Sequence, residues 1–261
     1  MTILDKIVEK KRVEVALAKQ KVSVVELESY PLYSRICYNL KESVLDPNKT
    51  GIIAEFKRAS PSKGMINEQA KVADTVRGYE LAGASAVSVL TDTAFFQGNL
   101  EDLTEAREAL SIPLLRKEFI VDTYQIAEAK AYGADIILLI AACLSIQEIR
   151  EFALFAKQLG LNVLLEVHNE QELMDNIGPN IDAIGINNRN LKDFSVDLQH
   201  SYDLVKKIPS DVIKVSESGI SDPEIIKDLK TAGFQSFLIG ENFMKTANPV
   251  NAIQEFVQQI K

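Results

Sequence analysis

The 261-residue chain contains no tryptophan and only two cysteines and two histidines. Cys37 and Cys143 belong to no CxxC or Cys/His spacing, and we expect both to be small buried side chains. His168 and His200 are too few and too far apart in the sequence to suggest a metal site. The sequence therefore predicts no metal centre.

An excess of basic residues is also lacking, since 29 Lys and Arg against 37 Asp and Glu give a formal net charge of -8. Nucleic-acid-binding modules usually carry a basic stripe, so we expect no nucleic-acid partner, and an anionic ligand must find a local basic cluster. No apolar run approaches the roughly 18 residues that span a bilayer, and residues 1–21 are charged throughout, unlike a signal peptide. We expect a cytoplasmic enzyme or binding protein without a membrane partner.

Glycine and proline are scarce, with 12 and 8 residues, and no G-x-G-x-x-G sequence occurs. An open doubly wound sheet that binds a dinucleotide should carry that sequence after its first strand, so its absence counts against such a fold. The 46% hydrophobic share and 25% charged residues describe a compact protein with ample core. The length suggests one or two domains, but barrels of about 250 residues are an exception.

From residue 51 onward, short apolar runs alternate with helical stretches. The runs are nearly continuous in apolar residues, as strands buried on both faces should be, and the spacing leaves room for a helix between each pair. We predict strands at Ile52–Lys57, Ala86–Leu90, Pro113–Lys117, Asp135–Ile140, Asn162–Val167, Ala183–Asn187, Val212–Glu217 and Ser236–Gly240. Eight strand–helix units without a linker predict an α/β fold, a single (β/α)8 TIM barrel domain over residues 1–261.

Residues 1–48 precede the first predicted strand, and we expect them to form an N-terminal helical extension. Thr2 with Asp5 can cap a first helix, and Ser23 with Glu26 can start a second. Later helices have predicted caps at Ser145, Asn169, Ser221 and Asn248, and predicted ends at Gly133, Gly160 and Gly233.

The first predicted strand ends with two charged residues. Glu55 and Lys57 are two residues apart, so on a strand they project from the same face. A loop rich in Ser, Pro, Lys and Gly follows over residues 59–67, and such a loop can close over a ligand. This pattern is typical of an active-site edge, and the alternative is an ordinary surface ion pair.

Active sites of TIM barrels lie at the C-terminal ends of the strands. In this chain those ends carry Glu55, Lys57, Lys117, Glu166, Asn187, Glu217 and Ser218. Each residue alone could be the polar position at which a buried strand reaches solvent. Lysines and glutamates that recur at one end of several strands would instead converge on one cavity, where burial and pairing shift their pKa values.

Glycines after the last two predicted strands suggest an anion site. Backbone N–H groups near Gly219 and Gly240, with the start of a short extra helix, can hold a phosphate, although both glycines could be plain turn residues. Lys57, Lys117 and Arg189 would make this mouth locally basic in an acidic protein.

Six segments, taken in order, resemble the indole-3-glycerol phosphate synthase family, and the resemblance covers the whole chain. They are IAEFKRASPS (53–62), SVLTD (88–92), RKEFI (116–120), LEVH (165–168), GINNR (185–189) and SESGI (216–220). The resemblance implies a carboxy-lyase of tryptophan biosynthesis that needs no cofactor. Its small phosphorylated substrate would be 1-(2-carboxyphenylamino)-1-deoxyribulose 5-phosphate, and its products indole-3-glycerol phosphate, carbon dioxide and water.

The same resemblance implies roles for the catalytic residues. Lys117 resembles the general acid that protonates the ketone oxygen as the aromatic ring attacks the ketone carbon. Glu166 resembles the acid of the later dehydration, with Glu55 and Lys57 close by, and which Lys or Glu serves each proton transfer stays open. The resemblance further implies that Asn187 binds substrate hydroxyls, Glu217 orients a lysine and Ser218 orients the substrate.

The resemblance also implies binding residues. Arg189 and Ser60 resemble positions that contact the anthranilate carboxylate or steady the loop. An apolar pocket for the aromatic ring would contain Phe96, Phe119 and Leu138, unless these residues only pack the core. The phosphate would lie against Ser218, Gly219 and Gly240.

Two residues depart from the family pattern. Glu118 follows Lys117 where Asp is commoner, and Glu241 follows Gly240 where Ser or Thr often helps to bind phosphate, so we expect the Glu241 carboxylate to point away from the anion. For His168 we expect a loop or capping role.

Two other functions remain open. Phosphoribosylanthranilate isomerase is a related barrel that relies on a Cys/Asp pair, but Cys37 precedes the first barrel strand and Cys143 follows the fourth. A barrel that only binds a phosphorylated metabolite would not need both acids and bases. We expect the chain to act as a monomer.

Overall fold

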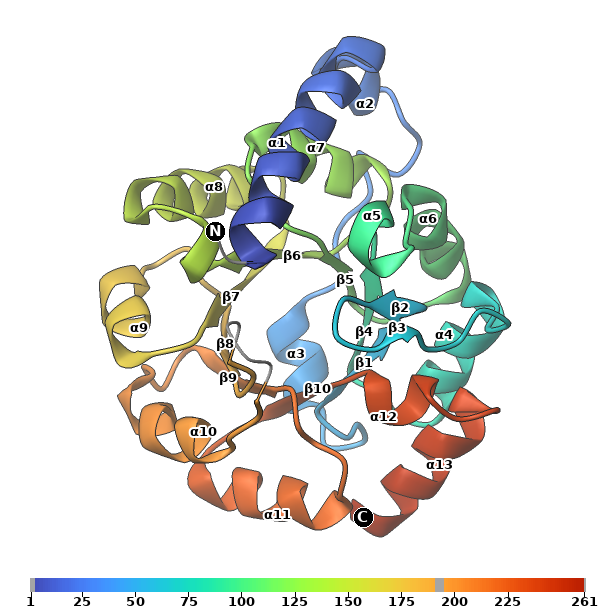
Figure 1. Ribbon diagram of the computed structural model, residues 1–261, viewed down its shortest axis with the longest axis vertical. Helices are drawn as coiled ribbons and strands as arrows, with labels where there is room; N and C mark the ends of the chain where they lie inside the picture. The colour runs from blue at the N-terminus through green and yellow to red at the C-terminus, as the bar shows by residue number, and fades with distance from the viewer. Residues whose placement is uncertain (1–2, 191–194, 261) are drawn as a thin grey trace.

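The computed structural model describes residues 3–190 and 195–260, and its centre is a closed barrel of parallel strands (Figure 1). Going around the barrel, the strands are β1 (Ile52–Phe56), β4 (Ala86–Leu90), β5 (Leu114–Lys117), β6 (Ile136–Ile140), β7 (Asn162–Val167), β8 (Ala183–Asn187), β9 (Ile213–Glu217) and β10 (Ser236–Ile239). Strand β1 pairs with both β4 and β10, which closes the sheet. The predicted (β/α)8 barrel is confirmed, with every predicted strand present to within one residue at either end.

The strands are apolar throughout because both of their faces are buried. Side chains such as Ile53, Leu115 and Leu164 fill the barrel interior, and alternating neighbours such as Ile52 and Leu114 pack outward against the helices. This continuous burial is the reason that near-continuous apolar runs identified the strands.

A ring of helices surrounds the barrel (Figure 1). It comprises α4 (Val72–Leu81), α6 (Leu100–Ala109), α7 (Thr123–Ala131), α8 (Ile146–Gln158), α9 (Glu170–Asn176), α10 (Gln199–Leu204), α11 (Pro223–Ala232) and α13 (Pro249–Ile260). Ser145 and Asn169 cap α8 and α9 as predicted. Asp222, rather than the predicted Ser221, caps α11, because Pro223 occupies the first helical position.

Four short segments lie between these elements. They are α5 (Thr93–Phe96), α12 (Glu241–Met244) and the 3₁₀ turns η1 (Ala141–Cys143) and η2 (Val205–Lys207). The loop after β1 contains a small antiparallel hairpin of β2 (Ala59–Ser60) and β3 (Gly64–Met65), which the sequence analysis did not predict. No helix within residues 3–190 and 195–260 is both long and apolar enough to cross a membrane.

Three helices precede β1: α1 (Ile3–Lys21), α2 (Val24–Glu28) and α3 (Leu40–Leu45). Helix α1 extends from the barrel mouth to the rim, whereas α3 lies at the opposite, N-terminal end of the barrel (Figure 1). Leu40 and Val44 of α3 join the apolar cluster of the barrel interior, so α3 closes that end. Ser23 caps α2 as predicted, and Thr2 lies outside the described residues.

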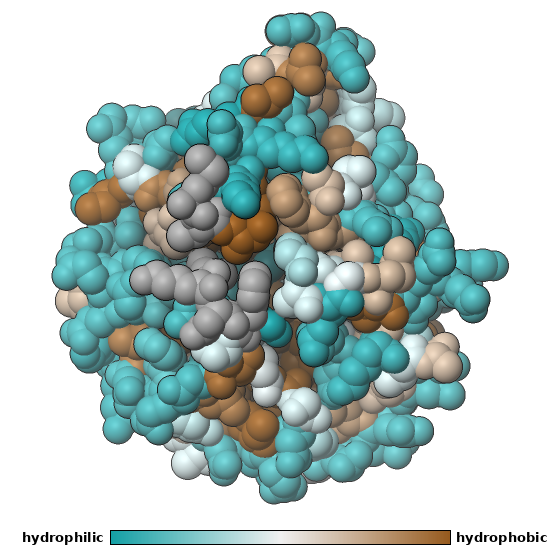
Figure 2. Space-filling model, in the orientation of Figure 1, coloured by the Kyte–Doolittle hydropathy of each residue, from teal (hydrophilic) through white to brown (hydrophobic). Residues whose placement is uncertain are grey.

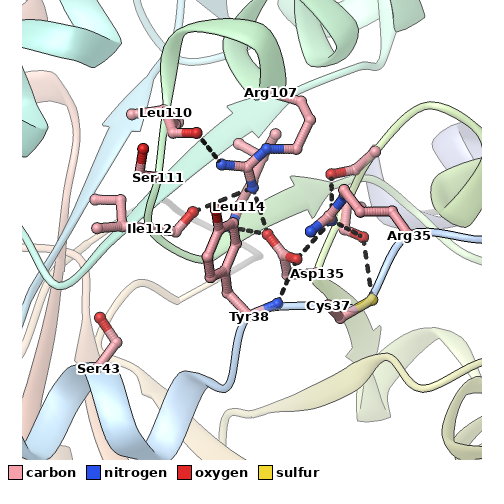
Figure 3. A network of polar contacts seen from close by, with 12 residues as sticks. Arg35, Cys37, Tyr38, Ser43, Arg107, Leu110, Ser111, Ile112, Leu114 and Asp135 are labelled. Carbon is pink, nitrogen blue, oxygen red and sulfur yellow. Dashed lines mark hydrogen bonds and ion pairs between the residues drawn. The ribbon is translucent and has the colours of Figure 1, made fainter. Parts of the chain in front are cut away.

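A cluster of charged side chains also lies at this closed end (Figure 3). The buried Asp135 carboxylate accepts hydrogen bonds from Arg35 Nη2 and Arg107 Nη1, each at 2.6 Å. The backbone N–H groups of Tyr38 and Leu114 donate to the same carboxylate at 2.8 and 2.9 Å. Two cationic groups, two backbone donors and one anion therefore tie the segment before α3 to the barrel.

Candidate active site

A cavity of about 500 Å³ opens at the C-terminal ends of the strands. Figure 2 shows this face as mostly hydrophilic at its rim, with apolar surface gathered near the centre beside the start of α1. Every site residue named from the sequence lines the cavity: Glu55, Lys57, Ser60, Phe96, Lys117, Phe119, Leu138, Glu166, Asn187, Arg189, Glu217, Ser218, Gly219 and Gly240.

The carboxylate and ammonium at the end of β1 form an ion pair. Lys57 Nζ lies 2.8 Å from Glu55 Oε1, and both side chains are largely buried, as expected for residues two apart on a strand. A Cβ atom at Gly240 would lie 2.5 Å from Glu55 Oε1, so any larger residue there would displace the carboxylate. Gly240 therefore leaves the space that Glu55 needs.

Lys117, the last residue of β5, is shared by two carboxylates, one from β7 and one from β9 on the opposite side of the barrel. Its Nζ lies 2.8 Å from Glu217 Oε2 and 3.1 Å from Glu166 Oε2. Asn187 Nδ2 donates to the other Glu166 oxygen at 2.9 Å. Among the described residues, the buried Glu217 Oε1 atom has no hydrogen-bond partner, and it occupies space that exists because Gly185 has no Cβ. Buried polar atoms rarely stay unpaired, so this oxygen marks the cluster as chemically unusual.

Pairing and burial shift the pKa values of this cluster in different directions. Burial alone lowers the pKa of Lys117, but the Glu217, Glu166 and Glu55 carboxylates outweigh it, so the pKa is raised and the amine stays protonated. Burial raises the pKa of Glu217 to about 7 against the opposing effect of Lys117. For Glu166, burial raises the pKa, but Lys117, His168 and Asn187 together hold it well below its usual value. The site thus pairs a protonated amine with two carboxyl groups of different proton affinity.

A second part of the cavity wall is apolar. The rings of Phe96 and Phe119 have centroids 6.1 Å apart with an interplanar angle of 37°, and Leu138 also lines the cavity. The sequence analysis missed a further contribution from Ile3, Leu4 and Ile7 at the start of α1.

A buried ion cluster holds α1 against this wall. Lys11 Nζ lies 2.7 Å from Glu14 Oε2, 2.8 Å from Asp92 Oδ2 and 3.2 Å from Glu118 Oε1, and only 7% of the Lys11 side chain is exposed. Glu118 also accepts a hydrogen bond from Thr91 Oγ1 at 2.8 Å. The residue that departs from the family pattern therefore anchors the N-terminal helix. The buried i, i+4 series Ile7, Lys11 and Val15 was the available sequence signal.

Glycines and basic side chains form a third side. Ser218 and Gly219 both have left-handed backbones, with φ of 70° and 81°, and such conformations cluster at functional sites in residues other than glycine. Contrary to expectation, the Glu241 carboxylate does not point away from this region. Its oxygens lie 3.7 Å from Lys63 Nζ and 3.7 Å from Arg189 Nη2.

The cysteines lie away from the cavity. Cys37 is near Lys130 at the closed end of the barrel, and Cys143 ends η1, so neither lines the cavity. Both are partly buried and pack against the apolar core, so the expectation of burial is met only in part. Among residues 3–190 and 195–260, no group of three or more His, Cys, Asp or Glu side chains could hold a metal ion.

Known proteins resemble this chain in fold or in sequence. Among solved structures, a thiamine phosphate pyrophosphorylase from Pyrococcus furiosus superposes with a TM-score of 0.60 at 16% identity, covering 85% of this chain and 98% of that one. The Pyrococcus furiosus tryptophan synthase complex contains a chain with a TM-score of 0.58 at 17% identity, covering 80% and 97%. At these identities the structures show the fold alone.

Sequence comparisons are more specific. The chain is 48% identical to an indole-3-glycerol phosphate synthase of Bacteroides thetaiotaomicron, over 99% of both chains. It is 44% identical to the corresponding protein of Aliarcobacter butzleri, over 97% of this chain and 98% of that one. The family profile described as Indole-3-glycerol phosphate synthase matches residues 4–256. The chain belongs to the indole-3-glycerol phosphate synthase family.

Proposed function

We propose that this chain closes the indole ring of 1-(2-carboxyphenylamino)-1-deoxyribulose 5-phosphate, with Lys117 as the general acid. Family membership makes the chain a decarboxylating lyase of tryptophan biosynthesis that acts on a small phosphorylated substrate. The single observation that supports the role of Lys117 is its position. The amine lies between Glu166 and Glu217, at the edge of a cavity that has an aromatic side and a basic, glycine-containing side.

Ring closure forms a carbon–carbon bond between the aromatic ring and the ketone carbon, and the ketone oxygen gains negative charge. Lys117 donates a proton to that oxygen, since the two neighbouring carboxylates keep its amine charged. The carboxyl carbon then leaves as carbon dioxide, and its electron pair returns to the ring. Loss of the new hydroxyl as water requires one more acid and one more base.

Glu166 and the Glu55–Lys57 pair are the groups available for dehydration. Glu166 is ionised in the free site, because Lys117 and His168 lower its pKa, so it takes up a proton before it can act as an acid. Asn187, which donates a hydrogen bond to one Glu166 oxygen, would also hydrogen-bond substrate hydroxyls. Glu217 holds Lys117 from the other side.

The binding residues follow the three sides of the cavity. Phe96, Phe119 and Leu138 would contact the aromatic ring, and the phosphate would lie against Ser218, Gly219 and Gly240. Arg189, with Ser60, would contact the anthranilate carboxylate. We further propose that the chain works in the cytoplasm as a monomer, a single barrel domain with residues 1–48 as a helical extension, without a cofactor or nucleic acid.

The test is to mix the purified protein with the carboxyphenylamino-deoxyribulose phosphate and to follow indole fluorescence, beside a Lys117→Ala variant. We expect the wild type to turn the substrate over and the variant to lose about 10²–10⁴-fold in kcat, the range for a general acid. Binding without turnover by both proteins would favour the non-catalytic barrel. The isomerase alternative lacks support in the structure, because neither cysteine lines the cavity.

A further inference from the structure

His168 does not line the cavity and has no role in the proposed chemistry, but its ring contacts Glu166, which does. It follows β7 directly, two residues after Glu166, and its Nε2 atom lies 3.3 Å from Glu166 Oε1. On its other side Nδ1 lies 3.5 Å from Glu172 Oε2. The imidazole therefore lies between two carboxylates, 12% exposed, behind the Glu166 face that meets Lys117.

The second carboxylate is held in place by the start of α9. Glu172 Oε2 accepts a hydrogen bond from the His168 backbone N–H at 2.8 Å, and Glu172 Oε1 accepts one from Asn169 Nδ2 at 2.7 Å. Asn169 in turn caps the helix by accepting from the Glu172 backbone N–H. The cap predicted from the sequence thus fixes an anion beside the ring of His168.

We propose that His168 is a positioning residue, an imidazolium that holds the Glu166 carboxylate ionised and turned toward Lys117 and Asn187. Two carboxylates that face both ring nitrogens are best satisfied when both nitrogens carry protons. Neither contact has the geometry of a good hydrogen bond, so the ring is held mainly by the attraction between its positive charge and the two carboxylates. The catalytic part of this inference rests on the proposed function.

The surrounding charges agree with a protonated ring. Burial alone lowers the pKa of His168, but Glu166 and Glu172 together raise it to about 10. The nearby Cys143 thiol in η1 is neutral, because burial and the same two carboxylates raise its pKa. Beyond Glu166, the facing groups are the Lys117 ammonium on β5 and Glu217 on β9.

Protonation can be tested without substrate. The chain has only two histidines, so the ring signals of isotope-labelled histidine can be assigned by NMR with a His200→Gln variant. We expect the His168 ring to stay doubly protonated from about pH 5.5 to 8.5, although an ordinary histidine titrates near about 6.5. A His168 titration near its ordinary value would overturn the proposal, whether or not the enzyme turns substrate over.

The catalytic arm compares His168→Phe, which keeps a ring without charge, with His168→Lys, which keeps the charge. We expect His168→Phe to lower kcat about 10-fold, with KM within about twofold, and to move the acidic limb of kcat upward by about one pH unit. His168→Lys should restore the limb. A slower His168→Phe enzyme with an unmoved limb would overturn the proposal in favour of packing.

A second variant tests the same role in case His168→Phe misfolds. Glu172→Gln changes the partly exposed carboxylate behind the ring and leaves Glu166 untouched. It should move the acidic limb of kcat in the same direction by a smaller amount, since His168 loses one of its two anionic partners. An unmoved limb with normal wild-type turnover would contradict the positioning role and leave the proposed function standing.

Discussion

Two clusters of buried charge lie at opposite ends of the same barrel, and they differ in how completely their atoms are paired. At the closed end, both oxygens of Asp135 are occupied by cationic and backbone donors (Figure 3). At the open end, Glu217 has one oxygen on Lys117, and its other oxygen has no hydrogen-bond partner within residues 3–190 and 195–260. A carboxylate whose two oxygens both accept hydrogen bonds is held in its ionised form, and we call it saturated. A carboxylate with an unpaired oxygen, which we call unsaturated, can take up and release a proton.

The two clusters contain similar charged residues, but one holds the fold together and the other lines the cavity. The Asp135 cluster joins the segment before α3 to α6 and β5, so it holds the bottom of the barrel together. The Lys117 cluster joins strands from across the barrel around an open cavity, and its carboxyl groups have pKa values shifted in opposite directions. We therefore expect changes in the first cluster to cost stability and changes in the second to cost activity.

The largest expected effect is that of Asp135→Asn, which leaves two guanidinium groups without their anion. Breaking a buried ion pair from one side costs roughly 3–5 kcal/mol of unfolding free energy. Because the cluster is at the far end of the barrel, kcat of the folded variant should stay within about twofold. Chemical denaturation and indole fluorescence at a low temperature measure both quantities.

Asp182→Asn is the matched control. Asp182 also directly precedes a barrel strand, and both of its oxygens lie 2.8 Å from Lys157 Nζ, but its side chain is 26% exposed. An ion pair that faces solvent contributes about 0–1 kcal/mol. Equal destabilisation by the two variants would contradict the view that full burial and saturation make the Asp135 cluster structural.

The sequence predicted the open end of the barrel better than the closed end. Polar residues at strand ends are visible in the chain, because each interrupts an apolar run at a regular place, as Lys117 and Glu166 do. Asp135 also adjoins such a run, but its partner Arg35 is 100 residues away, and nothing local identifies that pair. Tertiary structure alone brings the two together.

Helix α3 and the anchor of α1 were missed for different reasons. Helix α3 is only six residues long, but Asn39 and Glu42 form a capping pattern that could have revealed it. Lys11 occupies a position of α1 that the apolar series assigns to the core, and its anions Asp92 and Glu118 follow separate strands. A charged residue at a buried helix position indicates that a partner of opposite charge is buried beside it, but the sequence does not show which residue that partner is.

The second prediction concerns the unsaturated carboxyl group. Glu217→Gln removes the group whose pKa is about 7, so we expect an inflection of kcat/KM near pH 7 in the wild type that the variant lacks, and a roughly 10–100-fold lower kcat in the variant at pH 8. Stability should respond too. The folded pKa lies above the unfolded value, so wild-type stability contributed by Glu217 is complete at low pH and is lost as pH rises through 7. The variant should lack this loss.

Two measurements check the prediction: the pH profile of kcat/KM and denaturation at pH 5 and pH 8. Glu42→Gln is a suitable control, because this carboxylate is exposed at the start of α3 at the closed end. Persistence of the inflection in Glu217→Gln would assign it to another group and remove the contrast between the two ends.

The smallest expected effect is that of Lys11→Met, which tests whether the ion cluster of Lys11, Asp92 and Glu118 affects activity by holding α1 against the cavity. Loss of the cation leaves the Asp92 and Glu118 carboxylates facing each other, and the cheapest relief is local release of α1 rather than global unfolding. Since Ile3, Leu4 and Ile7 of α1 line the cavity, we expect KM to rise about 3–10-fold with little change in kcat. Hydrogen exchange should show lost protection in α1.

Lys19→Met is the control for this last change, because it breaks an ion pair of the same helix that is largely exposed. Lys19 Nζ lies 2.6 Å from Asp122 Oδ2, and 44% of the Lys19 side chain is exposed. Such a pair contributes less than about 1 kcal/mol, so KM and exchange in α1 should stay near wild type. If Lys11→Met left both KM and exchange unchanged as well, α1 would be held by its apolar face alone. The ion cluster of Lys11, Asp92 and Glu118 would then have no part in the site.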